Sequence, residues 1–245
     1  MKYTDMIPGT FLNRPNRFIA HVRIGEQTEV VHVKNTGRCK ELLIPGAKVF
    51  VEESENPNRK TKYDLVQVFK GEKLVNIDSQ MPNYLVREWL EHKEGKDGIN
   101  CQPGFYFSNI KKIQSEKTYG DSRFDLYLEY EEKKAWIEIK GVTLEEAGIC
   151  RFPDAPTQRG VKHIRELEKS LEDGYEAWII FVIQMNGMRQ FQPNWKTHEA
   201  FGDALVHAWQ AGVHILALEC NVSEGEIYIE KEIEINLKKE LLNVK

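Results

Sequence analysis

The sequence lacks any segment that would place it in or across a membrane. No apolar run approaches the ~20 residues of a membrane-spanning helix, and the first 18 residues, MKYTDMIPGTFLNRPNRF, contain no signal-peptide core. The four cysteines form no CxxC pair, which argues against a zinc knuckle and a disulfide framework. These absences predict a cytoplasmic protein with reduced thiols and no membrane partner.

Several enzyme motifs are also missing. The sequence contains no Walker loop, no GxGxxG and no GxSxG nucleophile elbow, which disfavours nucleotide-cofactor enzymes and serine hydrolases. No helix-turn-helix with a basic recognition helix is evident, which disfavours a conventional repressor. What is present is ordinary: 245 residues, 41% of them hydrophobic, are enough for one large domain or two modest ones.

Charge is distributed unevenly along the chain. Residues 1–70 carry 12 Lys and Arg against 8 Asp and Glu, whereas the remaining residues carry 22 against 30, for a net charge of −4. A basic N-terminal part followed by an acidic remainder is typical of a binding module joined to a different domain.

The first 80 residues predict an all-β domain. Five short segments are rich in β-branched and aromatic residues and are separated by turn signals. They cover residues 17–24, 29–35, 47–54, 63–70 and 73–79. Five strands in so short a stretch predict a small OB-like barrel, with a sandwich fragment as the alternative.

From residue 81 the pattern changes to a mixed α/β one. Helical spacing predicts helices over 81–93, 157–173 and 198–211, the last ending at Gly212. Between and after them lie a strand ending at residue 120, a hairpin over 120–141, an apolar strand over 176–184 and two further strands near the C-terminus. We therefore expect domains at 1–80 and 81–245, the second with a mixed sheet flanked by helices.

The hairpin, GDSRFDLYLEYEEKKAWIEIKG, carries an unusual set of polar side chains. Its first strand has an apolar face, formed by Phe124, Leu126, Leu128 and Tyr130. Alternation places Asp125 on the other face, together with Glu138 and Lys140 of the second strand. If Glu131 pairs with Lys134, Asp125 lies opposite Lys140 and diagonal to Glu138, ~7–8 Å away.

Asp, then Glu-x-Lys one strand later, is a minimal set for metal-assisted phosphodiester hydrolysis. Mg²⁺ takes one or two protein carboxylates together with waters, and it activates a bound water while it holds a phosphate oxygen. An ammonium beside it can orient that water. The alternative is a solvated strand face with a weak Asp125–Lys140 salt bridge.

Residues on two predicted helices extend this site. Glu88, on the helix before the hairpin, could supply a third carboxylate to the metal. Arg159, Lys162 and His163 lie in the first half of the helix after it, where they could bind phosphate near a helix N-terminus. The alternative for all four is a solvated helix position.

The N-terminal module carries basic residues interleaved with aromatic ones. A cationic groove with stacking aromatics is how OB-folds bind single-stranded nucleic acid. The candidates for nucleic-acid contact are Arg14, Arg17, Arg38, Arg59, Lys60 and Lys62. A soluble, highly charged loop is the alternative.

Taken together, these segments resemble the sugar fermentation stimulation protein family of prokaryotes. The resemblance runs from about Gly9 to Cys220 and includes NTGRCKELLIPGAKVFVEES, YGDSRFDLYLE, WIEIKGVTL and FPDAPTQRGVKHIREL. It implies an OB-like domain followed by a domain of the PD-(D/E)XK nuclease type, and a DNA-binding role linked to maltose metabolism. It also implies that Asp125, Glu138 and Lys140 are the nuclease-type motif, with Glu88 as a helical carboxylate.

Two positions depart from the pattern that the resemblance implies. Arg123 stands where the motif has proline, and Gly141 stands where the family often has asparagine. These departures affect supporting contacts rather than the proposed metal ligands. We therefore expect a Mg²⁺-dependent (or Mn²⁺-dependent) nuclease that acts on DNA, single-stranded or otherwise, or on RNA. The competing hypotheses are a non-catalytic DNA-binding regulator of sugar catabolism and a structural or interaction protein whose hairpin face is merely solvated.

Overall fold

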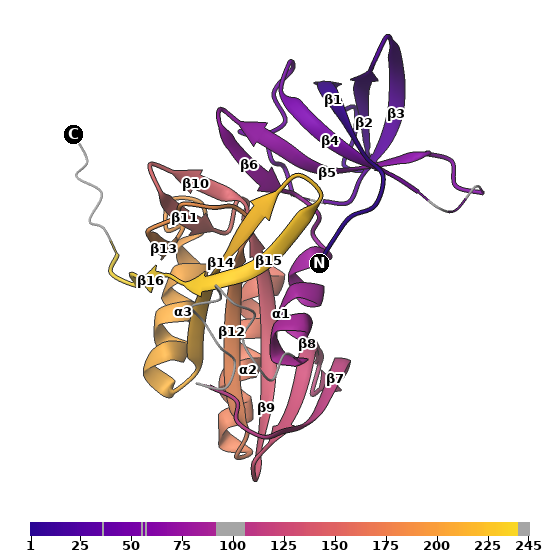
Figure 1. The fold of residues 1–245 in the computed structure, drawn as a ribbon. Helices are drawn as coiled ribbons and strands as arrows, with labels where there is room; N and C mark the ends of the chain where they lie inside the picture. The colour runs from indigo at the N-terminus through magenta and orange to yellow at the C-terminus, as the bar shows by residue number, and fades with distance from the viewer. Residues whose placement is uncertain (36, 55, 57, 92–105, 240–245) are drawn as a thin grey trace, which may run out of the picture.

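The computed structural model describes residues 1–35, 37–54, 56, 58–91 and 106–239. The chain forms an N-terminal β-barrel and a larger α/β part, which lies below the barrel in Figure 1. The predicted class is confirmed: an OB-like barrel precedes a mixed sheet flanked by helices.

Five strands close the barrel. They are β1 (Met6–Asn13), β2 (Ile19–Ile24), β3 (Gln27–Val33), β4 (Lys48–Glu53) and β5 (Tyr63–Lys70). Their order is β3-β2-β1-β4-β5, and the parallel pairing of β3 with β5 closes the ring. Closure removes the free strand edges, and it gives the interior a filled apolar core.

The predicted set of barrel strands is partly wrong. Strand β1 was not expected, and β6 (Lys73–Asn76), which was, pairs with β5 but takes no part in the closure. Pro8 and Gly9 interrupt β1 and imitate a turn. Gly9 is needed within the strand because a Cβ there would lie 2.6 Å from Cγ1 of Val22 on β2.

The α/β part is built on a six-stranded mixed sheet. In spatial order its strands are β15 (Glu226–Glu232), β14 (His214–Ser223), β12 (Glu176–Ile183), β9 (Lys133–Val142), β8 (Ser122–Tyr130) and β7 (Ile110–Tyr119). The three central strands are parallel to one another. Strand β12 is buried along nearly its whole length, as its apolar sequence predicts.

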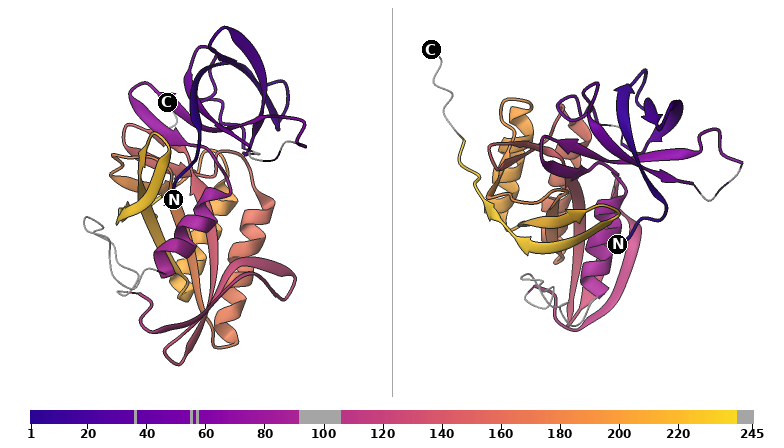
Figure 2. Two further views of the ribbon diagram at one scale, coloured as in Figure 1. Left: turned by 45° about the vertical axis from the view of Figure 1, so that its right-hand side comes forward. Right: turned by 45° about the horizontal axis from the view of Figure 1, so that its top comes forward.

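Helices cover both faces of this sheet (Figure 2). Helix α1 (Met81–Glu91) packs on one face, and α2 (Gln158–Glu172) and α3 (Glu199–Ala211) pack on the other. Thr157 caps α2 by accepting the N–H of Gly160. Helix α3 ends at Gly212 with φ of 113°, the stop that the sequence predicts. The helix expected over 81–93 is observed to Glu91, and residues 92 and 93 lie outside the described residues.

A second, four-stranded sheet was not expected. It consists of β10 (Leu144–Glu146), β11 (Ile149–Phe152), β13 (Gln190–Pro193) and β16 (Glu234–Ile235). Its first two strands lie between the predicted hairpin and the helix predicted from residue 157, where no strand was expected. Strands of two to four residues are too short to show an alternation of polar and apolar side chains, so β10, β11 and β13 could not be predicted from the sequence pattern.

The barrel and the α/β part share one hydrophobic core. A single cluster of buried side chains extends from Phe11 and Val22 in the barrel to Ile164 and Phe201 under α2 and α3. A bridge between Val75 and Met185 joins the two parts at the backbone. Cys39, Cys150 and Cys220 are buried free thiols, and Cys101 lies outside the described residues. Among the described helices, none is both long and apolar enough to span a membrane.

Candidate active site

The hairpin formed by β8 and β9 brings Asp125 and Glu138 together. Tyr130 pairs with Lys133 at the turn, and the last pair of the ladder is Leu126 with Ile137. The predicted register, with Glu131 opposite Lys134 and Asp125 opposite Lys140, is therefore wrong by two residues. The true register carries Glu138 toward Asp125 and moves Lys140 beyond it.

Asp125 interrupts the regular alternation of β8. Leu126, Leu128 and Tyr130 share one face, as expected, and this face packs under α1, but Phe124 packs on the α2 side, 6.2 Å from the ring of His163. Beyond the last ladder pair, the N–H of Ile139 donates to Oδ2 of Asp125 at 2.7 Å. A side-chain carboxylate thus replaces a backbone acceptor, and Phe124 is shifted to the other face of the sheet.

Each carboxylate is held by a different helix. Oδ1 of Asp125 accepts a hydrogen bond of 2.9 Å from the Asn83 amide of α1. Oε1 of Glu138 lies 2.5 Å from Nδ1 of His163 on α2 and also pairs with the Lys140 ammonium. The two acids consequently sit between the helices, at the end of the sheet where β9 runs toward the barrel (Figure 1).

The surroundings of the two carboxylates shift their pKa values in opposite directions. Burial, together with the nearby charge of Glu138, raises the pKa of Asp125 to about 6. Burial also acts to raise the pKa of Glu138, but the charge of Lys140 and the contact with His163 outweigh it, and this pKa lies below its usual value. At neutral pH the site therefore holds two neighbouring negative charges.

One atom of this pair has no partner. Glu138 is 2% exposed, and its Oε2 is buried without a hydrogen bond from any described residue. An unpaired buried carboxylate oxygen is costly, so Oε2 of Glu138 is a suitable ligand for a cation. Within the described ranges, no three His, Cys, Asp or Glu side chains group closely enough to bind a metal alone. Mg²⁺ needs only one or two protein carboxylates, and Asp125 with Glu138 fits that requirement.

The structure gives Glu88 a different role from the one expected. Its carboxylate pairs with the amino group of Met1 at 3.1 Å, and that amino group also donates to the carbonyl of Ile227 on β15. Glu88 follows Asn83 by five residues, which turns it ~140° around α1. The residue of α1 that reaches Asp125 is therefore Asn83, which the sequence did not identify because it reads as a helix-start signal.

The three predicted residues of α2 separate into two groups. His163 is 5% exposed and contacts Glu138 directly, and Nε of Arg159 lies 3.3 Å from Nε2 of the same imidazole. Lys162 instead donates to the backbone carbonyl of Asp121. Arg159 and His163 thus belong to the carboxylate cluster, as their spacing of four residues allows, whereas Lys162 fixes a turn.

The basic residues predicted to contact nucleic acid also fall into two groups. Arg59 makes a two-pronged pair with Asp64, Lys62 pairs with Glu53, and Lys60 is exposed on the same loop. Arg14, Arg17 and Arg38 instead line one concave surface, which none of these three loop residues lines. The loop residues are largely engaged with carboxylates, so the second group is the better candidate for binding an anion.

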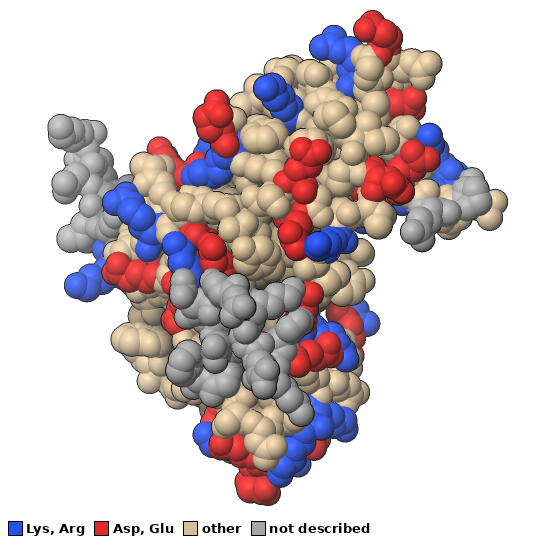
Figure 3. All heavy atoms as spheres, viewed as in Figure 1, with Lys and Arg blue, Asp and Glu red and all other residues tan. Residues whose placement is uncertain are grey.

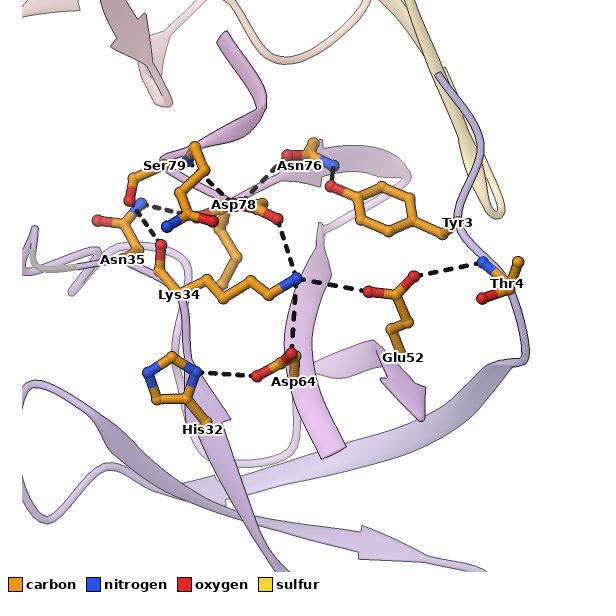
Figure 4. A network of polar contacts seen from close by, with 12 residues as sticks. Tyr3, Thr4, His32, Lys34, Asn35, Glu52, Asp64, Asn76, Asp78 and Ser79 are labelled. Atoms are coloured by element: carbon orange, nitrogen blue, oxygen red, sulfur yellow. Dashed lines mark hydrogen bonds and ion pairs between the residues drawn. The ribbon is translucent and has the colours of Figure 1, made fainter. Parts of the chain in front are cut away.

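A further charged cluster, centred on Lys34, was not predicted. Figure 4 shows its ammonium among the carboxylates of Glu52, Asp64 and Asp78, and the three N···O distances are 3.4 to 3.5 Å. Asp78 sits between β6 and α1 and accepts the N–H of Gln80. The cluster therefore connects barrel strands to the start of the helix that carries Asn83. In the sequence, this cluster is indicated only by Asp64, an acidic residue within the apolar strand β5.

The fold and this site define a class of protein: an OB barrel joined to a mixed α/β domain in which a buried Glu lies beside a partly buried Asp and a partly buried Lys. Comparison with known proteins agrees. The family model for the "SfsA N-terminal OB domain" matches residues 12–77, and that for the "sugar fermentation stimulation protein RE domain" matches residues 80–226. The chain belongs to the sugar fermentation stimulation protein family, as its motifs predict.

Close relatives cover the whole chain. A sugar fermentation stimulation protein homolog of Ruminiclostridium cellulolyticum is 55% identical over 97% of this chain and 100% of its own length. The homolog of Clostridium beijerinckii is 49% identical with the same coverage. The solved structure of Pyrococcus furiosus SfsA in complex with Ca²⁺ superposes with a TM-score of 0.83, at 29% identity, over 96% of this chain and 98% of that one.

Proposed function

We propose that this protein is a Mg²⁺-dependent nuclease that hydrolyses phosphodiester bonds at Asp125, Glu138 and Lys140. The observation that carries the proposal is the buried carboxylate pair, with one oxygen of Glu138 unbonded, beside an ammonium. The complex of the Pyrococcus furiosus relative with Ca²⁺ supports it, because Ca²⁺ and Mg²⁺ are both hard cations that prefer oxygen ligands.

Asp125 and Glu138 would hold the metal, and Mn²⁺ could replace Mg²⁺. When bound, such an ion lowers the pKa of a coordinated water and stabilises charge on the phosphate. Lys140 orients the attacking water and offsets the negative charge that builds up on the phosphoryl oxygens. Asn83 and His163 fix the orientation of the two carboxylates, and Arg159 holds the imidazole of His163.

The test is a cleavage assay with labelled single-stranded and double-stranded DNA and RNA. Each is incubated with Mg²⁺, Mn²⁺ or EDTA, using the wild type, Glu138→Ala and Lys140→Ala. We expect metal-dependent cleavage by the wild type and a loss of at least ~100-fold in both variants, the size typical of losing one positioned charged group. Lys162→Ala is the matched control, because its ammonium contacts only a backbone carbonyl of a turn, and it should cleave at the wild-type rate.

Two results contradict the proposal. Binding without cleavage under every metal condition leaves the DNA-binding regulator as the function. Cleavage that survives in both Glu138→Ala and Lys140→Ala places the chemistry elsewhere or in a contaminant.

A further inference from the structure

A concave surface beside the barrel is lined by basic residues without an acidic one. It encloses about 1140 Å³, and Arg14, Arg17, Arg38 and Lys40 all line it, together with Phe11 and Ala155. We call it the basic groove. On the face of the molecule drawn in Figure 3, by contrast, Lys and Arg are interspersed with Asp and Glu. A concave surface of one charge sign concentrates the field and attracts anions.

Three cations of the basic groove are free to bind a ligand. The side chains of Arg17, Arg38 and Lys40 make no ion pair or hydrogen bond with any residue that the structure describes. Arg14 differs, because its guanidinium donates to four backbone carbonyls, those of Arg17, Asn35, Gly37 and Arg38. Arg14 therefore fixes the groove wall, and the other three present uncompensated positive charge.

The basic groove continues toward the end of β9, just after Lys140. A second cavity of about 290 Å³ shares Gly37, Ala155 and Pro156 with it. We call this cavity the passage. Its wall includes Gly141, the residue directly after Lys140, and Thr157, the cap of the helix that carries His163. The basic groove and the passage together lead to the end of β9, past Asp154, which also lines the passage.

The size of the passage restricts what can enter it. Pockets for one small ligand measure about 300–1,000 Å³, so the passage admits a nucleotide-sized segment and not a duplex. Phe18 is 54% exposed and follows Arg17 directly in the chain. An exposed aromatic ring beside free cations is suited to stack a base while the cations contact phosphates.

We infer that the substrate is a single nucleic-acid strand, which lies in the basic groove and enters the passage to reach Asp125 and Glu138. The inference rests on the proposed function only for the cleavage of the strand. Where the strand binds can be tested without any cleavage. Arg17, Arg38 and Lys40 contact its phosphates, and the passage excludes a second strand.

Binding is tested first, in Ca²⁺ or EDTA so that no cleavage is needed. A labelled 20-nucleotide strand is titrated against wild type, Arg17→Glu/Lys40→Glu and the control Arg23→Glu/Lys48→Glu, with fluorescence anisotropy as the readout. The control makes the same charge change at exposed barrel positions outside the basic groove. We expect at least a tenfold weaker affinity for the first variant, and less than a threefold change for the control.

Salt dependence and strandedness sharpen this test. Each phosphate contact of a single strand contributes about −0.7 to the slope of log affinity against log salt, so losing two contacts should flatten the slope by roughly 1.4. The same sequence as a blunt duplex should bind at least tenfold more weakly than the single strand. Equal loss in the two double variants, or duplex binding as tight as single-strand binding, overturns the inference.

A second variant tests the passage. Ala155→Trp places a large side chain where basic groove and passage meet. We expect single-strand binding within threefold of wild type, Mn²⁺ affinity measured by calorimetry unchanged, and strand cleavage reduced at least tenfold. Unchanged cleavage by a folded Ala155→Trp protein overturns the path. If the wild type binds single strands as expected but never cleaves them, the proposed nuclease activity is refuted. The anisotropy measurements then still show whether the strand binds in the basic groove.

Discussion

At the scale of single residues, the charge of Glu138 affects the ionisation of Asp125. The largest cause of the raised pKa of Asp125 is burial, and the next is the charge of Glu138. Glu138→Gln removes that charge and keeps the shape. The pKa of Asp125 should then fall from about 6 toward its usual value without reaching it, because burial remains.

Carboxyl NMR of ¹³C-labelled, metal-free protein measures this change directly. Glu129→Gln is the matched control, since Glu129 lies on β8 with Asp125 but is only half-buried and accepts a hydrogen bond from Tyr127. Its replacement should leave the Asp125 titration where it is. An Asp125 pKa that does not move in Glu138→Gln would show that the two carboxylates are not neighbours.

Residues of the site were predictable where a local rule places them. Glu138 and Lys140 share a face because a strand alternates, and Arg159 meets His163 because four residues make about one helical turn. Asn83 and Glu88 lie on one helix, and no local rule tells which of them approaches Asp125. That choice depends on how α1 packs on the sheet, which only the tertiary structure supplies.

At the scale of elements, strand pairing decided which predictions failed. The hairpin turn contains two residues, as expected, but they are Glu131 and Glu132, so the turn lies one residue earlier than predicted and the partner of every later residue changes by two positions. The shift kept the polar face of β9 but changed the partner of Asp125 from Lys140 to Glu138. In the barrel, β1 was not predicted because it contains Pro8 and Gly9, residues that usually indicate a turn.

Barrel stability should depend on pH through Asp64 of β5. Burial acts to raise its pKa, but hydrogen bonds from Arg59 and His32 and the charge of Lys34 outweigh this effect and lower the pKa from 3.8 to about 2. A carboxyl with a depressed folded pKa stabilises the fold above its unfolded pKa, and that stability is lost as pH falls through the folded value. Between pH 4 and pH 2 the loss should be about 2 kcal/mol.

Denaturant unfolding at several pH values measures this contribution. Over the same interval, Asp64→Asn should lose about 2 kcal/mol less than the wild type, because the amide does not titrate. Asp203→Asn is a suitable control, since its carboxylate is exposed on α3 with a long 3.4 Å contact to Lys239. It should follow the wild-type pH curve. Parallel curves for Asp64→Asn and wild type would contradict the assignment.

At the scale of the whole molecule, two parts with different strand patterns share one core and one charged junction. Gln184, after β12, donates to Asn76 and to the carbonyl of Asp78, so the central sheet holds the segment between barrel and α1. Gly141 permits this contact, because a Cβ there would lie 2.5 Å from Oε1 of Gln184. A larger residue after the Glu-x-Lys motif would therefore require the junction to be rebuilt.

Lys34 should stabilise this junction. Burial works against its charge, but Asp78, Asp64 and Glu52 outweigh burial and raise its pKa. Lys34→Met leaves Asp78 and Glu52 without their ammonium, and breaking a largely buried ion pair costs about 3–5 kcal/mol. Since the side chain of Lys34 is 23% exposed, we expect a loss of about 2–4 kcal/mol in the free energy of unfolding. Lys112→Met, whose exposed pair with Glu129 spans 3.8 Å, should cost at most about 1 kcal/mol.

Limited proteolysis distinguishes a weakened junction from a general loss of stability. If Lys34 acts through Asp78, native Lys34→Met protein should be cut faster between β6 and α1, near residues 77–80, while the protection of β12 is unchanged, because local opening follows the contacts that are lost. If Lys34→Met were instead cut faster along the whole chain, with no preference for residues 77–80, the result would contradict this role.

Asp78 precedes α1, and Asn83 of that helix holds Asp125. The same variant should therefore also weaken Mn²⁺ binding at the carboxylate pair, an effect that an isolated barrel defect would not produce.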